Sequence, residues 1–130
     1  MNATIVMTVN AIVSIIFGAL LIVMPHDVAM FFGRAPLIGA EYIAGLYGAA
    51  LLGIGVIALT ARSATESDAG QAILLGLFVG SLIGLVLVLI EQLQGQGTMR
   101  AWINVAIFAY FTLGFGYNRF IKKSDSGGDA

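Results

Sequence analysis

The sequence predicts an all-α membrane protein, a bundle of four transmembrane helices with short loops and a short interfacial helix between the first two. Hydrophobic residues make up 59% of the 130 residues and charged residues only 10%, against about 25% charged residues in soluble domains. Backbone amides in lipid must bond within their own segment, which favours helices. Four apolar stretches reach the roughly 20 residues needed to cross hydrocarbon: 3–24, 37–61, 69–90 and 101–120.

Proline and glycine mark the connection between the first two spans. Pro25 ends the first span and Pro36 precedes the second, as expected of a residue without a backbone N–H. Between them, residues 26–33 predict a short helix with Asp27 as N-cap and Gly33 as the residue that stops it. Its Met and Phe side chains favour a position at the lipid headgroups.

The other connections are short and polar. The second loop covers 62–68 and the third covers 91–98, where Thr98 is a candidate N-cap for the fourth span. Residues 124–130 are rich in Ser, Gly and Asp, a composition typical of disordered ends. We therefore expect a single membrane domain over 1–123 and a disordered cytoplasmic tail over 124–130.

Composition excludes several classes of protein. The chain has no Cys and one His, so disulfides, zinc–cysteine sites and thiol nucleophiles are impossible. Six Lys and Arg against seven Asp and Glu do not provide the basic surface that nucleic-acid binding requires. No motif supplies a nucleophile with a base, a phosphate loop or a haem ligand pair. We expect no enzymatic activity, no cofactor and no bound metal.

Glycines are concentrated in the second and third spans at helical spacing. The chain has 17 glycines among 130 residues, nearly double the usual share of about 7%. Glycines four residues apart lie on one helix face, where the missing Cβ lets a neighbouring backbone approach closely. Close packing, within the bundle or between copies of the chain, is predicted at Gly45, Gly48, Gly53, Gly76, Gly80 and Gly84.

Polar residues near membrane depth gather at one end of the predicted bundle. Ionisable groups there are costly, and by default they suggest a functional site. Glu41 begins the second span on its glycine face, Glu91 follows the third span, and Arg100 lies at the start of the fourth. The full set of candidate ligand-binding residues is His26, Asp27, Glu41, Glu91, Arg100 and Asn104.

Three interpretations of this set stay open. In the structural one, Glu41 complements the dipole of its helix, Glu91 and Arg100 pair across the third loop, and the first-loop residues are interfacial. In the functional one, the set lines a water-accessible pocket for a lipid headgroup, a small solute or a proton. A metal site is the least favoured, because one His and scattered carboxylates are a weak donor set.

Two further polar residues lie within apolar spans. Asn10 is in the first span and Ser81 is in the third. Such side chains in membrane bundles usually form hydrogen bonds between helices. We expect both to face the interior.

Basic residues in short loops predict the orientation in the membrane. With four spans, one side carries four positive residues and the other carries two. The more basic side holds Arg62, Arg119, Lys122 and Lys123, and the other holds Arg34 and Arg100. The sequence predicts a multi-pass protein of the inner (cytoplasmic) membrane with both termini in the cytoplasm.

Two stretches resemble a known group of membrane families. Residues 24–33 read MPHDVAMFFG, and residues 41–55 read EYIAGLYGAALLGIG. Together they resemble the short bacterial four-helix families grouped around DoxX, in which a Pro-led amphipathic turn follows helix 1 and an acidic residue precedes a Tyr- and Gly-rich helix 2. The resemblance covers about the first 60 residues. The resemblance implies the four-helix fold. It implies no particular activity, because these families have no firmly shared one.

These observations predict a non-enzymatic inner-membrane protein, an accessory or structural component of a homo-oligomer or a larger membrane complex. Its expected partners are the lipid bilayer and other copies or subunits, with no nucleic acid. The alternative is a transporter or binding bundle for a small solute, a lipid or a proton that uses the extracytoplasmic polar residues.

Overall fold

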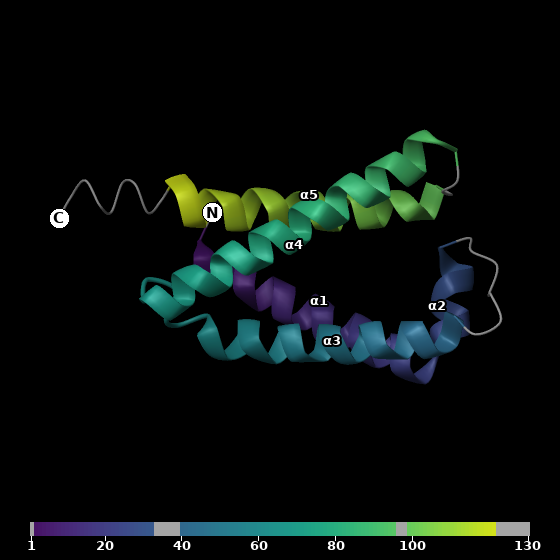
Figure 1. The fold of residues 1–130 in the computed structure, drawn as a ribbon, viewed down its shortest axis with the longest axis horizontal. Helices are drawn as coiled ribbons and strands as arrows, with labels where there is room; N and C mark the ends of the chain where they lie inside the picture. The colour runs from purple at the N-terminus through teal and green to yellow at the C-terminus, as the bar shows by residue number, and fades with distance from the viewer. Residues whose placement is uncertain (1, 33–39, 96–98, 122–130) are drawn as a thin grey trace.

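The computed structural model describes residues 2–32, 40–95 and 99–121, and every regular element in these ranges is a helix (Figure 1). The all-helical prediction is therefore confirmed for the described residues. In chain order the elements are α1 (Ala3–Val23), α2 (Pro25–Phe31), α3 (Ala40–Ala61), α4 (Asp68–Leu93), the 3-10 turn η1 (Met99–Ala101), α5 (Trp102–Gly116) and the π-helical turn η2 (Tyr117–Ile121).

Three of the described helices are long and apolar enough to cross a membrane. They are α1 with 21 residues, α3 with 22 and α4 with 26. The predicted fourth span, 101–120, is instead divided among η1, α5 and η2. The 15 residues of α5 extend about 23 Å, less than the ~30 Å of hydrocarbon, so the fourth crossing would also require η2.

Local hydrogen bonds account for several helix ends. The Asn2 side chain accepts from the Thr4 N–H at 2.8 Å and caps α1, while the Ser67 hydroxyl accepts from the Gly70 N–H at 3.0 Å and caps α4. The prediction of Asp27 as an N-cap is wrong. Pro25 starts α2, so Asp27 lies within its first turn. There its negative charge interacts favourably with the positive end of the helix dipole.

Some expected features fall on residues outside the described ranges. They are the N-terminal end of the second span, the stop at Gly33, the proposed cap at Thr98 and the tail at 124–130. The structure does extend the third span to Leu93, beyond the predicted end at 90.

The long helices form two antiparallel pairs, α1 with α3 and α4 with α5 (Figure 1). Backbone meets backbone in the first pair: a Cβ added at Gly18 or Gly48 would lie 2.7 Å from the carbonyl oxygen of the other residue. In the second pair, Gly84 packs against the ring of Phe108 and Gly116 against the ring of Phe78. Missing Cβ atoms thus set the spacing within both pairs.

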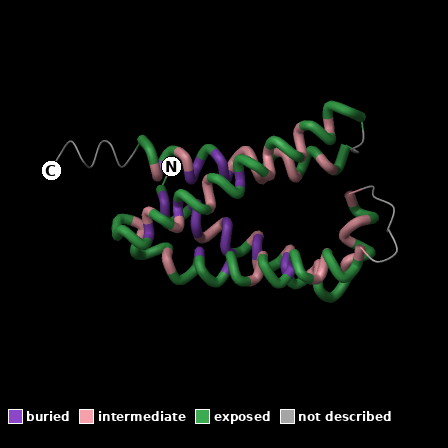
Figure 2. Tube along the Cα trace, viewed as in Figure 1, coloured by how far each residue is buried: buried purple, intermediate pink, exposed green. Residues whose placement is uncertain are grey.

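The two pairs are packed together at one end of the molecule and diverge toward the other (Figure 1). We call the narrow end the one where α1 begins and η2 ends. At the wide end, α2 and the start of α3 lie opposite the end of α4 and the start of α5. Buried residues concentrate toward the narrow end (Figure 2). The buried core there consists of Val6, Met7, Ala11, Ala58, Leu74, Phe111 and Phe115.

Candidate functional site

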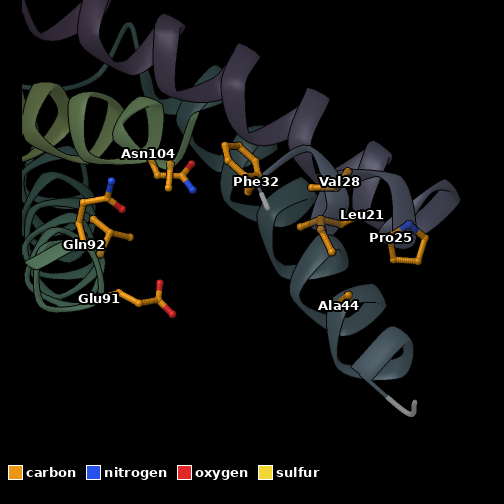
Figure 3. A pocket seen from close by; sticks show the side chains of 11 residues that line it. Leu21, Pro25, Val28, Phe32, Ala44, Glu91, Gln92 and Asn104 are labelled. Atoms are coloured by element: carbon orange, nitrogen blue, oxygen red, sulfur yellow. The ribbon is translucent and has the colours of Figure 1, made fainter. Parts of the chain in front are cut away.

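A cavity of about 240 Å³ lies at the wide end, between the two helix pairs (Figure 3). One wall comes from the end of α4 and the start of α5 and presents the polar side chains of Glu91, Gln92 and Asn104. In Figure 3 the Glu91 carboxylate points from α4 into the space between the pairs. This wall of the cavity therefore contains one carboxylate and two amide side chains.

The opposite wall is apolar. Leu21 from α1 and Ala44 from α3 contribute to it, and α2 contributes Pro25, Val28 and Ala29. Phe32, which follows α2, completes this wall and stacks on Phe17 of α1 with 6.2 Å between ring centroids. A molecule in the cavity would meet polar groups on one side and hydrocarbon on the other.

The short helix α2 is in contact with the first helix pair and with η1, the turn that precedes α5. His26 Nδ1 lies 3.1 Å from Glu41 Oε1, which connects α2 to α3. At the other end of α2, the Arg100 guanidinium carbon lies 5.3 Å from the centre of the Phe31 ring, a cation–π contact that connects α2 to η1. These two contacts hold α2 beside the cavity, although none of its residues is fully buried.

The structure thus divides five of the six candidate binding residues into two groups. Glu91 and Asn104 line the cavity. His26, Glu41 and Arg100 belong to the contacts that hold α2, and the side chains of His26 and Glu41 are 53% and 57% exposed. The position of Glu41 on the glycine face suggests that its side chain points into the bundle interior. In the structure this side chain is instead largely exposed. Asp27 lies in the first turn of α2 and is exposed.

Sequence reasoning missed Gln92 as a polar lining residue. The apolar pattern ends at Ile90, which predicts that the following residues belong to the third loop. The helix instead continues through Leu93, and this extra turn orders Glu91 and Gln92 along the cavity wall. The apolar positions of α2 at Val28 and Ala29 were a usable signal, since amphipathic spacing in so short a helix indicates one covered face.

The predicted packing glycines also divide into two groups. Gly48 meets α1 and Gly84 meets Phe108 of α5. A Cβ added at the other four positions would have no atom of the described residues within 4 Å: Gly45, Gly53, Gly76 and Gly80. The glycines that pack closely but are not among the six are Gly18, Gly55, Gly70, Gly114 and Gly116.

The described residues form a helical protein with three helices long and apolar enough to span a membrane, and with a cavity between two helix pairs that has one polar and one apolar wall. Within those residues, no group of three or more His, Asp and Glu side chains is placed to hold a metal ion. Comparisons with protein-family models, curated proteins and solved structures find no match to this chain. The resemblance to the DoxX-like families stays a prediction from residues 24–33 and 41–55.

Proposed function

We propose that the chain crosses the inner membrane four times, with η2 completing the fourth span, and binds the polar part of a small amphipathic molecule at its wide end. The observation that carries this proposal is the cavity with one polar and one apolar wall. It supports the transporter or binding-bundle hypothesis over a purely structural role for the polar residues.

The size of the cavity limits the ligand. Pockets for drug-sized molecules start at about 300 Å³, and this cavity measures about 240 Å³. A lipid headgroup or a small solute fits that volume, whereas an entire phospholipid does not. We therefore propose that any acyl chain leaves the cavity between the diverging pairs and lies in the bilayer.

The chemistry of the walls favours a ligand with hydrogen-bond donors at its polar end. Glu91 offers carboxylate oxygens, and Gln92 and Asn104 offer both amide donors and acceptors. The apolar wall formed by Val28, Phe32 and Leu21 would cover the first carbon atoms behind the headgroup. Hydroxylated or amine-bearing headgroups meet both requirements.

Native mass spectrometry of the protein extracted from its membrane in mild detergent tests this proposal. Ala44 lines the cavity, so Ala44→Leu should fill it, while Ala50 on the exposed side of α3 offers Ala50→Leu as the matched control. We expect bound phospholipid or solute on the parent protein and the control, and at least a fivefold lower bound fraction in Ala44→Leu. An unliganded parent protein, or equal occupancy in the two variants, would refute it.

A second function, self-association as an accessory component, is favoured by the outward-facing glycines of α4. Gly76 and Gly80 are exposed and have open space where a Cβ would be, so the backbone is accessible to another transmembrane helix. Crosslinking in membranes tests this: Gly80→Leu should abolish a crosslinked dimer, and Gly53→Leu on α3 should retain it. Isolated monomers with no co-purifying protein would contradict this function.

A further inference from the structure

Polar side chains are buried inside the bundle, far from the cavity. Asn10 on α1, Ser81 on α4 and Thr112 on α5 are only 6%, 8% and 9% exposed. Among the described residues, Asn10 Oδ1 and Thr112 Oγ1 have no hydrogen-bond partner. An oxygen left unpaired in an apolar interior is destabilising, so these atoms require an explanation beyond helix packing.

Packing contacts place Ser81 and Thr112 at the same level on facing helices. Gly84 meets Phe108 on one side of them, and Phe78 meets Gly116 on the other. In the antiparallel pair, Ser81 is three residues from each of its flanking contacts on α4 and Thr112 is four residues from each on α5. The two hydroxyl-bearing residues therefore lie opposite each other.

Asn10 reaches nearly the same level from α1. Gly114 packs against Val6, and α1 and α5 run in opposite directions (Figure 1). With about 1.5 Å per residue, Asn10 lies about 6 Å from this contact and Thr112 about 3 Å from it, both toward the wide end. The three polar residues thus occupy one layer to which α1, α4 and α5 each contribute.

This layer lies near the middle of the membrane-spanning segments. Ser81 is at the centre of α4, Thr112 is at the centre of the continuous stretch 102–121, and Asn10 is three residues from the centre of α1. The aromatic and aliphatic core around it includes Met7 and Phe115, both fully buried.

Further unpartnered polar atoms connect this layer with the narrow end. Asn118 Oδ1, Gln71 Oε1 and Arg119 Nε are buried and have no hydrogen-bond partner among the described residues. Asn118 belongs to the π-helical turn η2, where its Nδ2 donates to the Gly114 carbonyl at 2.8 Å.

We propose that Asn10, Ser81 and Thr112 form a mid-membrane binding site for water, reached from the narrow end past Asn118 and Arg119. Water is small, and it supplies the donor that the Asn10 and Thr112 oxygens require. Buried waters typically make two to four hydrogen bonds to such groups, and three helices provide them here. The site is separate from the wide-end cavity and does not depend on the ligand proposed there.

Cysteine accessibility in intact membrane vesicles tests the site, because the parent chain has no Cys. Thiols react as thiolates, which form only where water reaches them. Each interior position has an exposed neighbour at almost the same depth, so Thr112→Cys is compared with Leu113→Cys, and Ser81→Cys with Leu82→Cys. The probe is methanethiosulfonate ethylammonium, added to either side of the membrane.

We expect the interior cysteines to react at least five times faster than their lipid-facing neighbours, and from the narrow-end side. Interior rates equal to or below those of the neighbours would refute the site, and faster reaction from the wide-end side would refute the route of entry.

A second measurement determines whether the Thr112 hydroxyl binds water or has no hydrogen-bond partner. Thr112→Val keeps the shape of the side chain and removes its hydroxyl, and Thr112→Ser keeps the hydroxyl. If water binds Thr112, the valine variant should unfold at a lower temperature than the serine variant. A valine variant as stable as the parent protein, or more stable, would show that Thr112 binds no water and would overturn the proposal.

Discussion

The contact between Gly18 and Gly48 gives a sharp prediction about how the first helix pair is held together. In the Gly48→Ala variant, the new methyl carbon would lie 2.7 Å from the Gly18 carbonyl oxygen and 3.0 Å from Ile22 Cγ1. The nearer atom belongs to the backbone, so it cannot move away by rotating a side chain. The α1 and α3 backbones must therefore separate.

The expected cost follows from two opposing effects. Overpacking a well-packed interface destabilises by about 1–3 kcal/mol, whereas replacing Gly by Ala within a helix stabilises it by about 1 kcal/mol. At Gly48 the net loss should be about 0–2 kcal/mol of unfolding free energy. At Gly45, one turn away on the same helix, an added Cβ has no atom within 4 Å in the part of the chain that the structure describes, so Gly45→Ala should be neutral or slightly stabilising.

Reversible unfolding in mixed micelles, followed by circular dichroism, measures both variants under one condition. Gly48→Leu should lose more stability than Gly48→Ala, because a larger side chain forces the helices further apart. Equal stability of Gly48→Ala and Gly45→Ala would refute the close approach of α1 and α3.

Two smaller effects are expected at the helix ends. The Thr4 hydroxyl donates to the Arg62 carbonyl at 3.0 Å and links the start of α1 to the residue after α3. Thr4→Val should therefore lose about 0.5–1 kcal/mol of unfolding free energy in the same assay. A Thr4→Ser variant as unstable as the valine variant would contradict this expectation. Glu41→Gln weakens the exposed contact with His26, so it should cost less than about 1 kcal/mol and show no effect in ~1 M salt, where charges are screened. A loss that persists at high salt would contradict the second expectation.

Much of the helical architecture follows from the sequence alone. Long apolar runs must satisfy their backbone groups internally, and this accounts for α1, α3 and α4. The division of residues 102–121 into α5 and η2 was less predictable, because η2 contains a side-chain hydrogen bond from Asn118 to the Gly114 carbonyl. No local composition signal marks that bond.

The glycine pattern predicted close helix contacts without identifying their partners. Glycine allows a backbone to approach, and whether one does so depends on how helices far apart in the chain are paired. Gly48 has such a partner in Gly18, whereas Gly45 has none among the described residues. Spacing along one helix contains no information on this difference.

The candidate site was predictable in part: its polar residues could be placed from the sequence, and the cavity could not. Helix ends at the same side of the membrane come close together in any four-span arrangement, so Glu91 and Asn104 were placed at one end from residue counting alone. The cavity itself depends on the divergence of the two pairs toward α2, which is a property of tertiary packing. The role of Arg100 beside Phe31 likewise required the position of α2.

Spin-label distances measured in lipid bilayers test the central claim, that two helix pairs meet at the narrow end and diverge around a cavity. The absence of Cys allows labels at chosen exposed positions on α3 and α4. The wide-end pair is Ile43→Cys with Val86→Cys, and the narrow-end pair is Ile57→Cys with Ala72→Cys. The account predicts a clearly longer distance for the wide-end pair, and equal distances at the two ends, as in a parallel closed bundle, would contradict it.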